Sequence, residues 1–191
     1  MLSVELIFDR TSADIYEAEE MMKLPWWEFT EEQQLAFLNG LRGCYDFSDL
    51  NRVETAVAEI SQRMISLPDE LDALAASAGG RWDKYALPYN PEEARLDVKT
   101  TWAPAELFEE SERERYLSNV KYIRDSLAPK LPMPENFDTF DWNAANQLEK
   151  ILFKADEALT AFKAKAESEI EADSAGFKIR SGEPYSGEVR V

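Results

Sequence analysis

The chain has 191 residues and a formal net charge of −17, with 38 acidic against 21 basic side chains. This charge repels phosphate backbones and anionic membranes, so we expect neither nucleic acid nor a membrane as a partner. Histidine is absent, which removes the commonest general base and zinc ligand and excludes every Ser/His or Cys/His nucleophile. A hydrophobic content of 45% is nevertheless enough for a folded core.

The single cysteine, Cys44, excludes an internal disulfide and is interpreted as a buried thiol. No apolar run approaches the length of a membrane span, and residues 1–10 lack the basic start and long apolar core of a secretion signal. The expectation is a soluble protein made in the cytoplasm. Its length fits one domain with an appendage.

The N-terminal segment, residues 1–44, is expected to hold a short strand and two helices. Apolar and polar residues alternate over residues 3–8, which predicts the strand. Residues 9–23 place apolar side chains along one helical face. Thr30 and Gln33 have the spacing of a capping box, and they begin a second helix that stops at the glycines further on.

A pattern recurs three times, over residues 45–64, 108–127 and 140–159. Each copy begins with an aromatic residue followed by an acid, has a helix-capping side chain three residues after the aromatic, and continues with apolar residues at helical spacing. The predicted caps are Ser48, Ser111 and Asn143. One capped helix cannot bury its own apolar stripe, so three equivalent helices are expected to pack as a bundle over residues 45–172.

Two elements are expected between the first and second copies. A short helix follows Ser66, with Pro68 in its first turn and two glycines, Gly79 and Gly80, at its end. Residues 96–102 then alternate between apolar and polar side chains, which predicts a short strand insertion.

The third copy opens a long helix, from Asn143 to about Ala172, that neither glycine nor proline interrupts. Its apolar residues follow the alternating three- and four-residue spacing of a coiled-coil seam. The seam consists of Leu148, Leu152, Ala155, Leu159, Phe162 and Ala166. Two interpretations are open, because the helix is either a member of the bundle or a stalk whose seam is shared between subunits.

The last segment, residues 173–191, is expected to form a terminal β-hairpin. Phe177 and Ile179 on one side, and Val189 and Val191 on the other, flank a turn rich in glycine and proline. A lone two-stranded hairpin is marginal in water, so this one is expected to add to a sheet in its own chain or in a neighbour.

Candidate catalytic and metal-binding groups are few. With 38 acids, adjacent carboxylates arise by coincidence, and the pairs lie where solvated helix faces or helix starts would place them. Asp46, Asp49 and Asn51 resemble a calcium loop, but the glycine and closing glutamate of that loop are missing. Phosphate-cradling glycine loops, nucleophile elbows and dinucleotide fingerprints are also absent. We therefore expect no catalytic residue, no metal site and no cofactor.

The five tryptophans offer a binding surface instead. Trp102 and Trp142 are interpreted as core residues. The adjacent pair Trp26 and Trp27 cannot easily bury both rings, so it is expected to mark a contact surface. The alternative is a sugar-stacking platform that also includes Trp82.

Several segments resemble tail-region proteins of phages and prophages of Gram-positive bacteria. They are LNGLRGCYDFSDLNRVE at 38–54, FDRTSAD at 8–14, RYLSNV at 115–120, NAANQLEKIL at 143–152 and YSGEV at 185–189. Cys44 stands where alanine is expected, and Asp46 where asparagine is expected. The resemblance implies a virion component near the baseplate or tail fibres, present in several copies and without active-site residues.

These observations predict a mainly α protein with minor β, in which a helical bundle is built on three repeated capped helices, a long C-terminal helix and a terminal β-hairpin. The expected function is non-enzymatic assembly in a virion tail, with itself as a homotrimer and with other tail or baseplate proteins as partners. The expected contact residues are Leu148, Leu152, Leu159, Phe162, Phe177, Ile179, Val189, Val191, Trp26 and Trp27. A glycan-binding adaptor and a carboxylate-only hydrolase are the alternatives.

Overall fold

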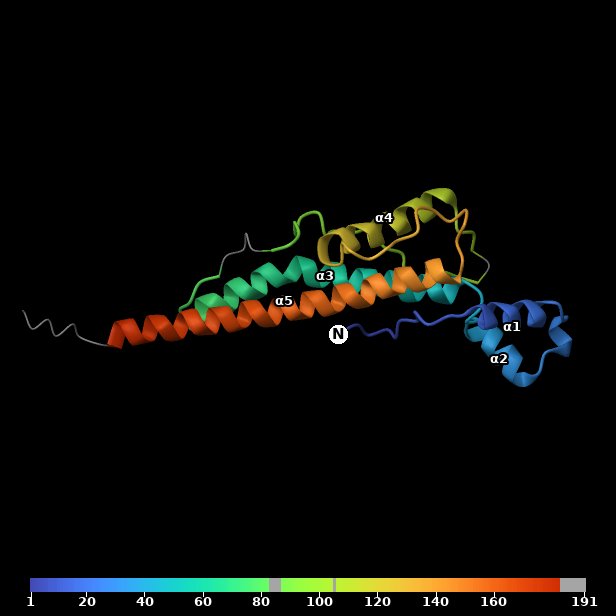
Figure 1. Ribbon diagram of the computed structural model, residues 1–191, viewed down its shortest axis with the longest axis horizontal. Coiled ribbons are helices and arrows are strands. Elements are labelled where there is room, and N and C mark those ends of the chain that lie inside the picture. The colour runs from blue at the N-terminus through green and yellow to red at the C-terminus, as the bar shows by residue number, and fades with distance from the viewer. Residues whose placement is uncertain (83–86, 105, 183–191) are drawn as a thin grey trace, which may run out of the picture.

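The computed structural model describes residues 1–82, 87–104 and 106–182, with side chains described as far as residue 175. The described chain is mainly helical and contains no strand. Its elements are α1 (Ser12–Met22), the short 3-10 helix η1 (Trp26–Glu28), α2 (Glu31–Asn39), α3 (Phe47–Ala78), α4 (Glu110–Leu127) and α5 (Trp142–Gly182). The molecule is elongated, with α3 and α5 side by side along its length and α1 and α2 at one end (Figure 1).

The three long helices run parallel to one another. Near their starts, Arg52 of α3 contacts Glu149 of α5 at 2.9 Å, and near their far ends Lys163 of α5 contacts Glu70 of α3 at 2.6 Å. Arg115, early in α4, binds Glu54, early in α3. Parallel neighbours in one chain need a connection that returns along the helices, and the described residues between α3 and α4 and residues 128–141 belong to the two returns (Figure 1).

The prediction that two segments form strands is wrong. Both segments are extended, but side chains of the helices bind their backbone where a partner strand would. We call residues 2–10 the N-terminal strap and residues 94–103 the second strap. In the N-terminal strap, Ser3 N donates to Glu59 at 2.8 Å and Ile7 N donates to Glu149 at 2.6 Å. In the second strap, Trp102 N donates to the side chain of Asn51 at 2.6 Å, and that side chain donates back to Trp102 O at 3.0 Å.

Apolar and polar side chains alternate in these straps because each strap is extended over the helices, not because it belongs to a sheet. One side of each strap faces the helices, where Val4, Leu6, Leu96 and Val98 pack against the core. The other side is turned to solvent, so the two-residue period of an extended chain is preserved without strand pairing. Carboxylates and amides on α3 and α5 satisfy the backbone N–H groups that a second strand would otherwise have paired.

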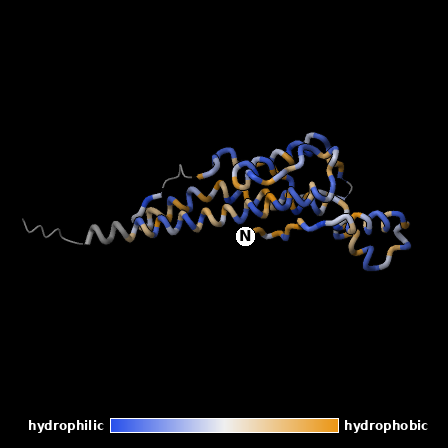
Figure 2. The backbone as a smooth tube through the Cα atoms, in the orientation of Figure 1, coloured by the Kyte–Doolittle hydropathy of each residue, from blue (hydrophilic) through white to orange (hydrophobic). Residues whose placement is uncertain are grey.

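The core lies between α3, α4 and α5. Apolar positions recur at helical spacing along these helices (Figure 2). Leu148, Leu152 and Leu159 are at most 1% exposed, so the seam of the last helix is buried within its own chain. Burial of each such leucine stabilises the fold by about 2 kcal/mol. Between the two interpretations of this helix, membership of the bundle is therefore the one that the structure supports.

Helix α3 is longer than predicted, since the short helix expected after Ser66 is its continuation. Pro68 lies inside α3, and Leu67 and Leu71 on either side of it are buried in the same stripe as the residues before them. The apolar contacts of this stripe therefore outweigh the hydrogen bond that proline removes. The helix ends as predicted, with Gly79 in the left-handed conformation (φ +71°).

Helix α5 continues through Phe177 and Ile179 to Gly182. The prediction that these two residues form the first strand of a terminal hairpin is therefore wrong. Residues 173–181 contain one glycine, Gly176, and no proline, and a single glycine costs only about 1 kcal/mol in a helix, so the backbone of α5 extends through this segment. The second predicted strand, with Val189 and Val191, lies outside the described residues.

The residues that immediately precede α3, α4 and α5 lie two positions before the predicted caps. Helix α3 has Asp46 as its N-cap, with the carboxylate accepting a hydrogen bond from Ser48 N at 2.8 Å, and α4 has Glu109. Asp141 immediately precedes α5 and accepts from Ala144 N at 2.8 Å. In each case the residue at the start is the acid that follows the aromatic, because a carboxylate is favoured by the positive end of the helix dipole.

Aromatic rings close the end of the bundle at which the three helices begin. Tyr45 meets Phe140 with ring centroids 4.8 Å apart, Phe140 stacks on Phe137 at 4.5 Å, and Phe137 meets Phe108 at 5.0 Å. The hydroxyl of Tyr45 is hydrogen-bonded to that of the fully buried Tyr116. Burial raises the pKa of both phenols above the usual range, so both remain protonated at neutral pH.

A buried charge cluster lies beside these rings. Glu149 of α5 is fully buried and accepts hydrogen bonds from Arg10 Nη2 at 2.7 Å, Arg52 Nε at 2.9 Å and Ile7 N at 2.6 Å. Asp49 pairs with the same two arginines. Burial alone would lower the pKa of Arg52, but its bond to Glu149 and the charges of Glu149 and Asp49 outweigh burial and raise it. The cluster therefore binds the N-terminal strap to both α3 and α5.

Removal of one tyrosine hydroxyl should cost more than removal of both. Tyr45→Phe leaves the buried hydroxyl of Tyr116 without its partner, so the free energy of unfolding should fall by about 2 kcal/mol. In the double variant Tyr45→Phe/Tyr116→Phe no polar group is left unpaired, and most of this loss should be recovered. Urea unfolding of the wild type, both single variants and the double variant gives the coupling free energy between the two hydroxyl groups. A double variant as unstable as the two single losses added together would contradict the buried pair.

Neutralisation of the central carboxylate should destabilise the bundle. In Glu149→Gln the guanidinium groups of Arg10 and Arg52 lose one buried counter-charge, and the free energy of unfolding should fall by about 3 kcal/mol. The matched control is Glu157→Gln on the exposed face of the same helix, where a solvated pair with Lys154 is lost. Urea unfolding should place the control within about 0.5 kcal/mol of the wild type. Equal losses in the two variants would count against a buried cluster.

Candidate interaction surface

The N-terminal helices form a separate projection that we call the head, residues 11–43. Helix α1 leads outward, η1 and the adjoining residues turn the chain, and α2 returns toward the start of α1 (Figure 1). Capping boxes begin both helices. Thr11 N donates to Asp14 at 2.6 Å, and Thr30 N donates to Gln33 at 2.9 Å, the second of which the sequence predicts. The hydrogen bonds from Thr11 lower the pKa of Asp14.

The head has little core of its own. Helix α1 buries only Ala18 and Met21, and none of the nine residues of α2, all of them described, is buried. Its main internal contacts are aromatic, with the ring of Trp26 5.4 Å from Phe29 and 5.6 Å from Phe37. Isolated helices of this length are marginal in water, so most of their stability has to come from packing.

Large apolar side chains are exposed on the head to an unusual degree. Of the twelve large apolar side chains that are exposed in the described chain, eight belong to the head. They are Tyr16, Met22, Leu24, Trp26, Trp27, Leu35, Phe37 and Leu38. Trp27 is 81% exposed, and Leu38 is 62% exposed. A concentration of this kind is typical of a surface that contacts another protein.

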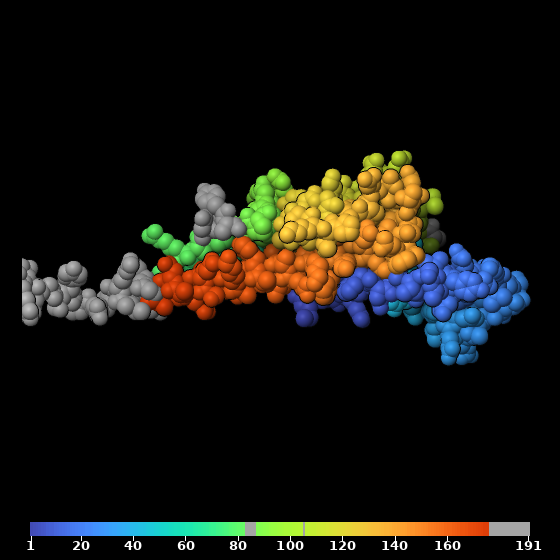
Figure 3. All heavy atoms as spheres, in the orientation of Figure 1, coloured from blue at the N-terminus to red at the C-terminus, as the bar shows by residue number. Residues whose placement is uncertain are grey.

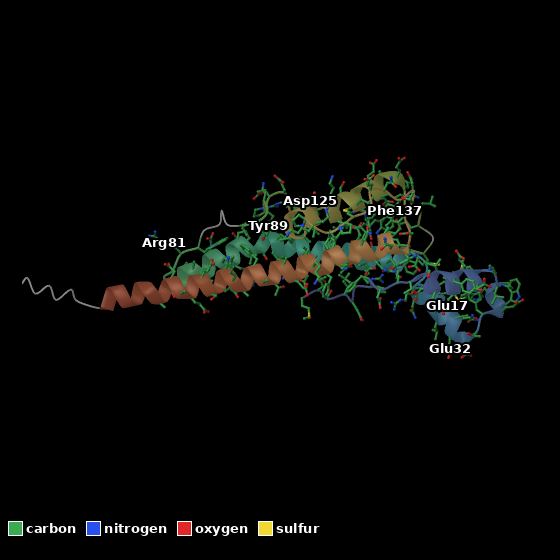
Figure 4. The ribbon with its side chains drawn as sticks, in the orientation of Figure 1. Glu17, Glu32, Arg81, Tyr89, Asp125 and Phe137 are labelled. Carbon is green, nitrogen blue, oxygen red and sulfur yellow. The ribbon has the colours of Figure 1, made fainter. Side chains whose placement is uncertain are left out.

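A groove of about 740 Å³ runs between α1 and α2. Ala18, Met21 and Ala36 are among its apolar lining residues. Glu17 and Glu32 also line it, and Figure 4 shows both on the head. The head occupies one end of the molecule, where the rest of the chain approaches it from one side (Figure 3).

The charge of the head is strongly negative. Seven carboxylates face only two basic side chains between residues 11 and 43. Both basic groups are engaged, because Lys23 pairs with Glu20, and Arg42 pairs with Asp9 and Asp14. The hydrogen bond from Arg42 lowers the pKa of Asp9, so this carboxylate is ionised at neutral pH. The apolar surface is thus surrounded by uncompensated negative charge.

Glycines attach the head to the bundle. Gly40 ends α2 with φ +94°, a conformation that other residues rarely adopt. A Cβ atom at Gly43 would lie 2.0 Å from Asp14 O and 2.7 Å from the Cβ of Ala18. The start of α1 therefore packs directly on the backbone that leads into α3, and only glycine allows this approach.

The expected contact residues lie in different environments. Trp26 and Trp27 are exposed on the head. The prediction for Leu148, Leu152 and Leu159 is wrong, because they are buried within the chain and cannot reach another one. Phe162 packs against the same core. Phe177 and Ile179 belong to α5 without described side chains, and Val189 and Val191 lie outside the described residues.

A tryptophan platform for sugars does not form. The indole of Trp82 donates to Asp72 at 2.7 Å, near the end of α3. Its neighbour Arg81 lies at the opposite end of the molecule from the head (Figure 4).

The sequence did not predict that Leu35 and Leu38 are exposed, since the apolar spacing of α2 is typical of a buried face. Only the shortage of facing apolar residues nearby could have indicated that they are exposed.

Candidate reactive groups do not converge. Burial raises the pKa of the Cys44 thiol, which makes it a poor nucleophile. Asp46 caps α3, Asp49 belongs to the buried charge cluster, and Asn51 binds the second strap, so these three do not form a calcium loop. In the part of the chain that the structure describes, no three acidic or cysteine side chains gather as metal ligands would. None of the described helices is both long and apolar enough to cross a membrane.

Comparison with known proteins leaves the head as the main evidence for function. The chain matches no protein-family model, no curated protein and no solved structure. The structural features that bear on function are therefore the exposed apolar surface of the head and its negative charge.

Proposed function

We propose that the chain is a non-enzymatic structural protein that binds a partner protein through the head. The observation that carries this proposal is the concentration of exposed large apolar side chains on the head, of which Tyr16 and Leu24 also line the groove between α1 and α2. Apolar area removed from water at the contact would supply the binding free energy, and the surrounding carboxylates would orient the partner.

The proposed setting is the tail, baseplate or fibre-attachment region of a phage or prophage particle. Support comes from where the resembling segments lie. Residues 8–14 contain Arg10, residues 38–54 contain Asp49 and Arg52, and residues 143–152 contain Glu149, and these side chains meet in the buried charge cluster. Segments that resemble one group of proteins thus hold together the base of the head.

Two finer parts of the proposal concern architecture. The helices α3, α4 and α5 each begin two residues after the aromatic of the repeated pattern, which supports three equivalent units in one bundle. Self-association as a homotrimer is also proposed, but the buried seam of α5 cannot mediate it. Copies of the chain would have to meet through other surfaces, in contact with other tail or baseplate proteins.

Incorporation into particles should depend on the head. In a lysogen that encodes the chain, phage particles purified by density gradient should contain the wild-type protein. The double variant Trp27→Glu/Leu38→Glu should be depleted from the particles by at least about tenfold, because two charges would be buried at the contact. Quantitative mass spectrometry of the particles measures this.

The matched control is Leu107→Glu, which changes a side chain that is 77% exposed and lies outside the head. It should enter particles like the wild type. Circular dichroism should show that both variants are folded. Absence of the wild-type chain from particles would contradict the tail setting, and undiminished incorporation of the double variant would contradict docking through the head.

A further inference from the structure

We infer that the groove of the head binds a basic amphipathic helix of a partner protein. This inference rests on the proposed docking function and specifies the chemistry of the partner. Three features of the head lead to it: the shape of the groove, the composition of its lining and the sign of the surrounding charge.

The shape of the groove fits a third helix. Two neighbouring helices, α1 and α2, form its walls, and an amphipathic helix laid between them would complete a three-helix core. Helix α1 has 11 residues and is about 16 Å long, which corresponds to three turns of an occupant. An occupant of this length presents about five apolar side chains on one face.

The lining supplies contacts for that apolar face. Ala18 and Met21, the two buried residues of α1, form the floor of the groove, and Leu24, Ala36 and Leu41 supply further apolar surface beside them. From α2, binding would cover Ala36, which is exposed.

The charge of the surroundings selects a basic partner. Glu17, Glu20 and Glu32 line the groove and are exposed. Lys23 is paired with Glu20, and Arg42, which also lines the groove, is paired with Asp9 and Asp14, so neither cation offsets Glu17 or Glu32. Lysine or arginine side chains that flank the apolar face of a helix would meet these carboxylates. A second copy of the head, docked symmetrically through the same face, would instead bring two acidic surfaces together. A partner with basic flanks is therefore favoured over self-association through this groove.

The test uses a synthetic probe of defined chemistry. The probe is an amidated peptide of leucine and lysine, about four helical turns long, with leucine at amphipathic helix spacing. A second peptide carries glutamate in place of every lysine. Isothermal titration at physiological ionic strength should show one leucine–lysine peptide bound per chain, with micromolar affinity, and no binding of the leucine–glutamate peptide.

Two variants of the head locate the binding site. Glu17→Gln/Glu20→Gln/Glu32→Gln should weaken binding by at least about tenfold. Ala36→Trp keeps the charge of the chain and fills the groove, so it should also weaken binding by about tenfold or more. The matched control is Glu157→Gln/Glu169→Gln/Glu171→Gln, which removes three exposed charges from α5 and should leave the affinity unchanged.

Several results would overturn the inference. They are equal binding of the two peptides, equal weakening by the head and α5 triple variants, and unchanged binding by Ala36→Trp. Light scattering that showed a dimer of the wild type and a monomer of Ala36→Trp would assign the groove to a second copy. If the peptide fails to bind while incorporation into particles still depends on Trp27 and Leu38, the helix proposal falls and the docking function stands.

Discussion

The fold depends on the charges buried around Glu149, because they join the N-terminal strap to both α3 and α5. A fully buried carboxylate is costly unless every lone pair is used. Here two arginines and a backbone N–H satisfy it, and they come from the N-terminal strap and α3. The strap in turn leads directly into α1. The position of the head relative to the bundle therefore follows from this cluster and from the close packing at Gly43.

Parallel packing of α3, α4 and α5 gives the molecule two different ends. The starts of these helices, with acidic caps, aromatic rings and the buried charges, lie at the end that carries the head. At the other end α5 runs on past the last residues of α3 (Figure 1). An antiparallel bundle would have mixed starts and ends at each pole. The parallel arrangement therefore places the acidic caps and the buried charges at one end, where the exposed apolar surface also lies.

Much of the helical structure could be predicted from the sequence, because local signals determine it. The capping box at Thr30, the glycine stop at Gly79 and the three starts near Tyr45, Phe108 and Phe140 all depend on neighbouring residues. The straps could not be predicted as such, since an extended chain alternates in the same way whether a strand or a helix faces it. The exposure of Trp26 and Trp27 could be predicted because two adjacent tryptophans cannot easily both be buried. The exposure of Leu35 and Leu38 could not, because it depends on which residues pack opposite them in the fold.

The buried charges also bear on how the protein acquires its fold during synthesis. Arg10 emerges from the ribosome when its partner Glu149 has yet to be translated, and the N-terminal strap has no carboxylate in α5 to receive Ile7 until most of the chain is complete. Pairings this far apart in sequence slow folding, because a large loop must close before they form. The nascent head, with its exposed tryptophans, therefore spends most of translation unanchored, a period in which a chaperone or an early-bound partner would protect it.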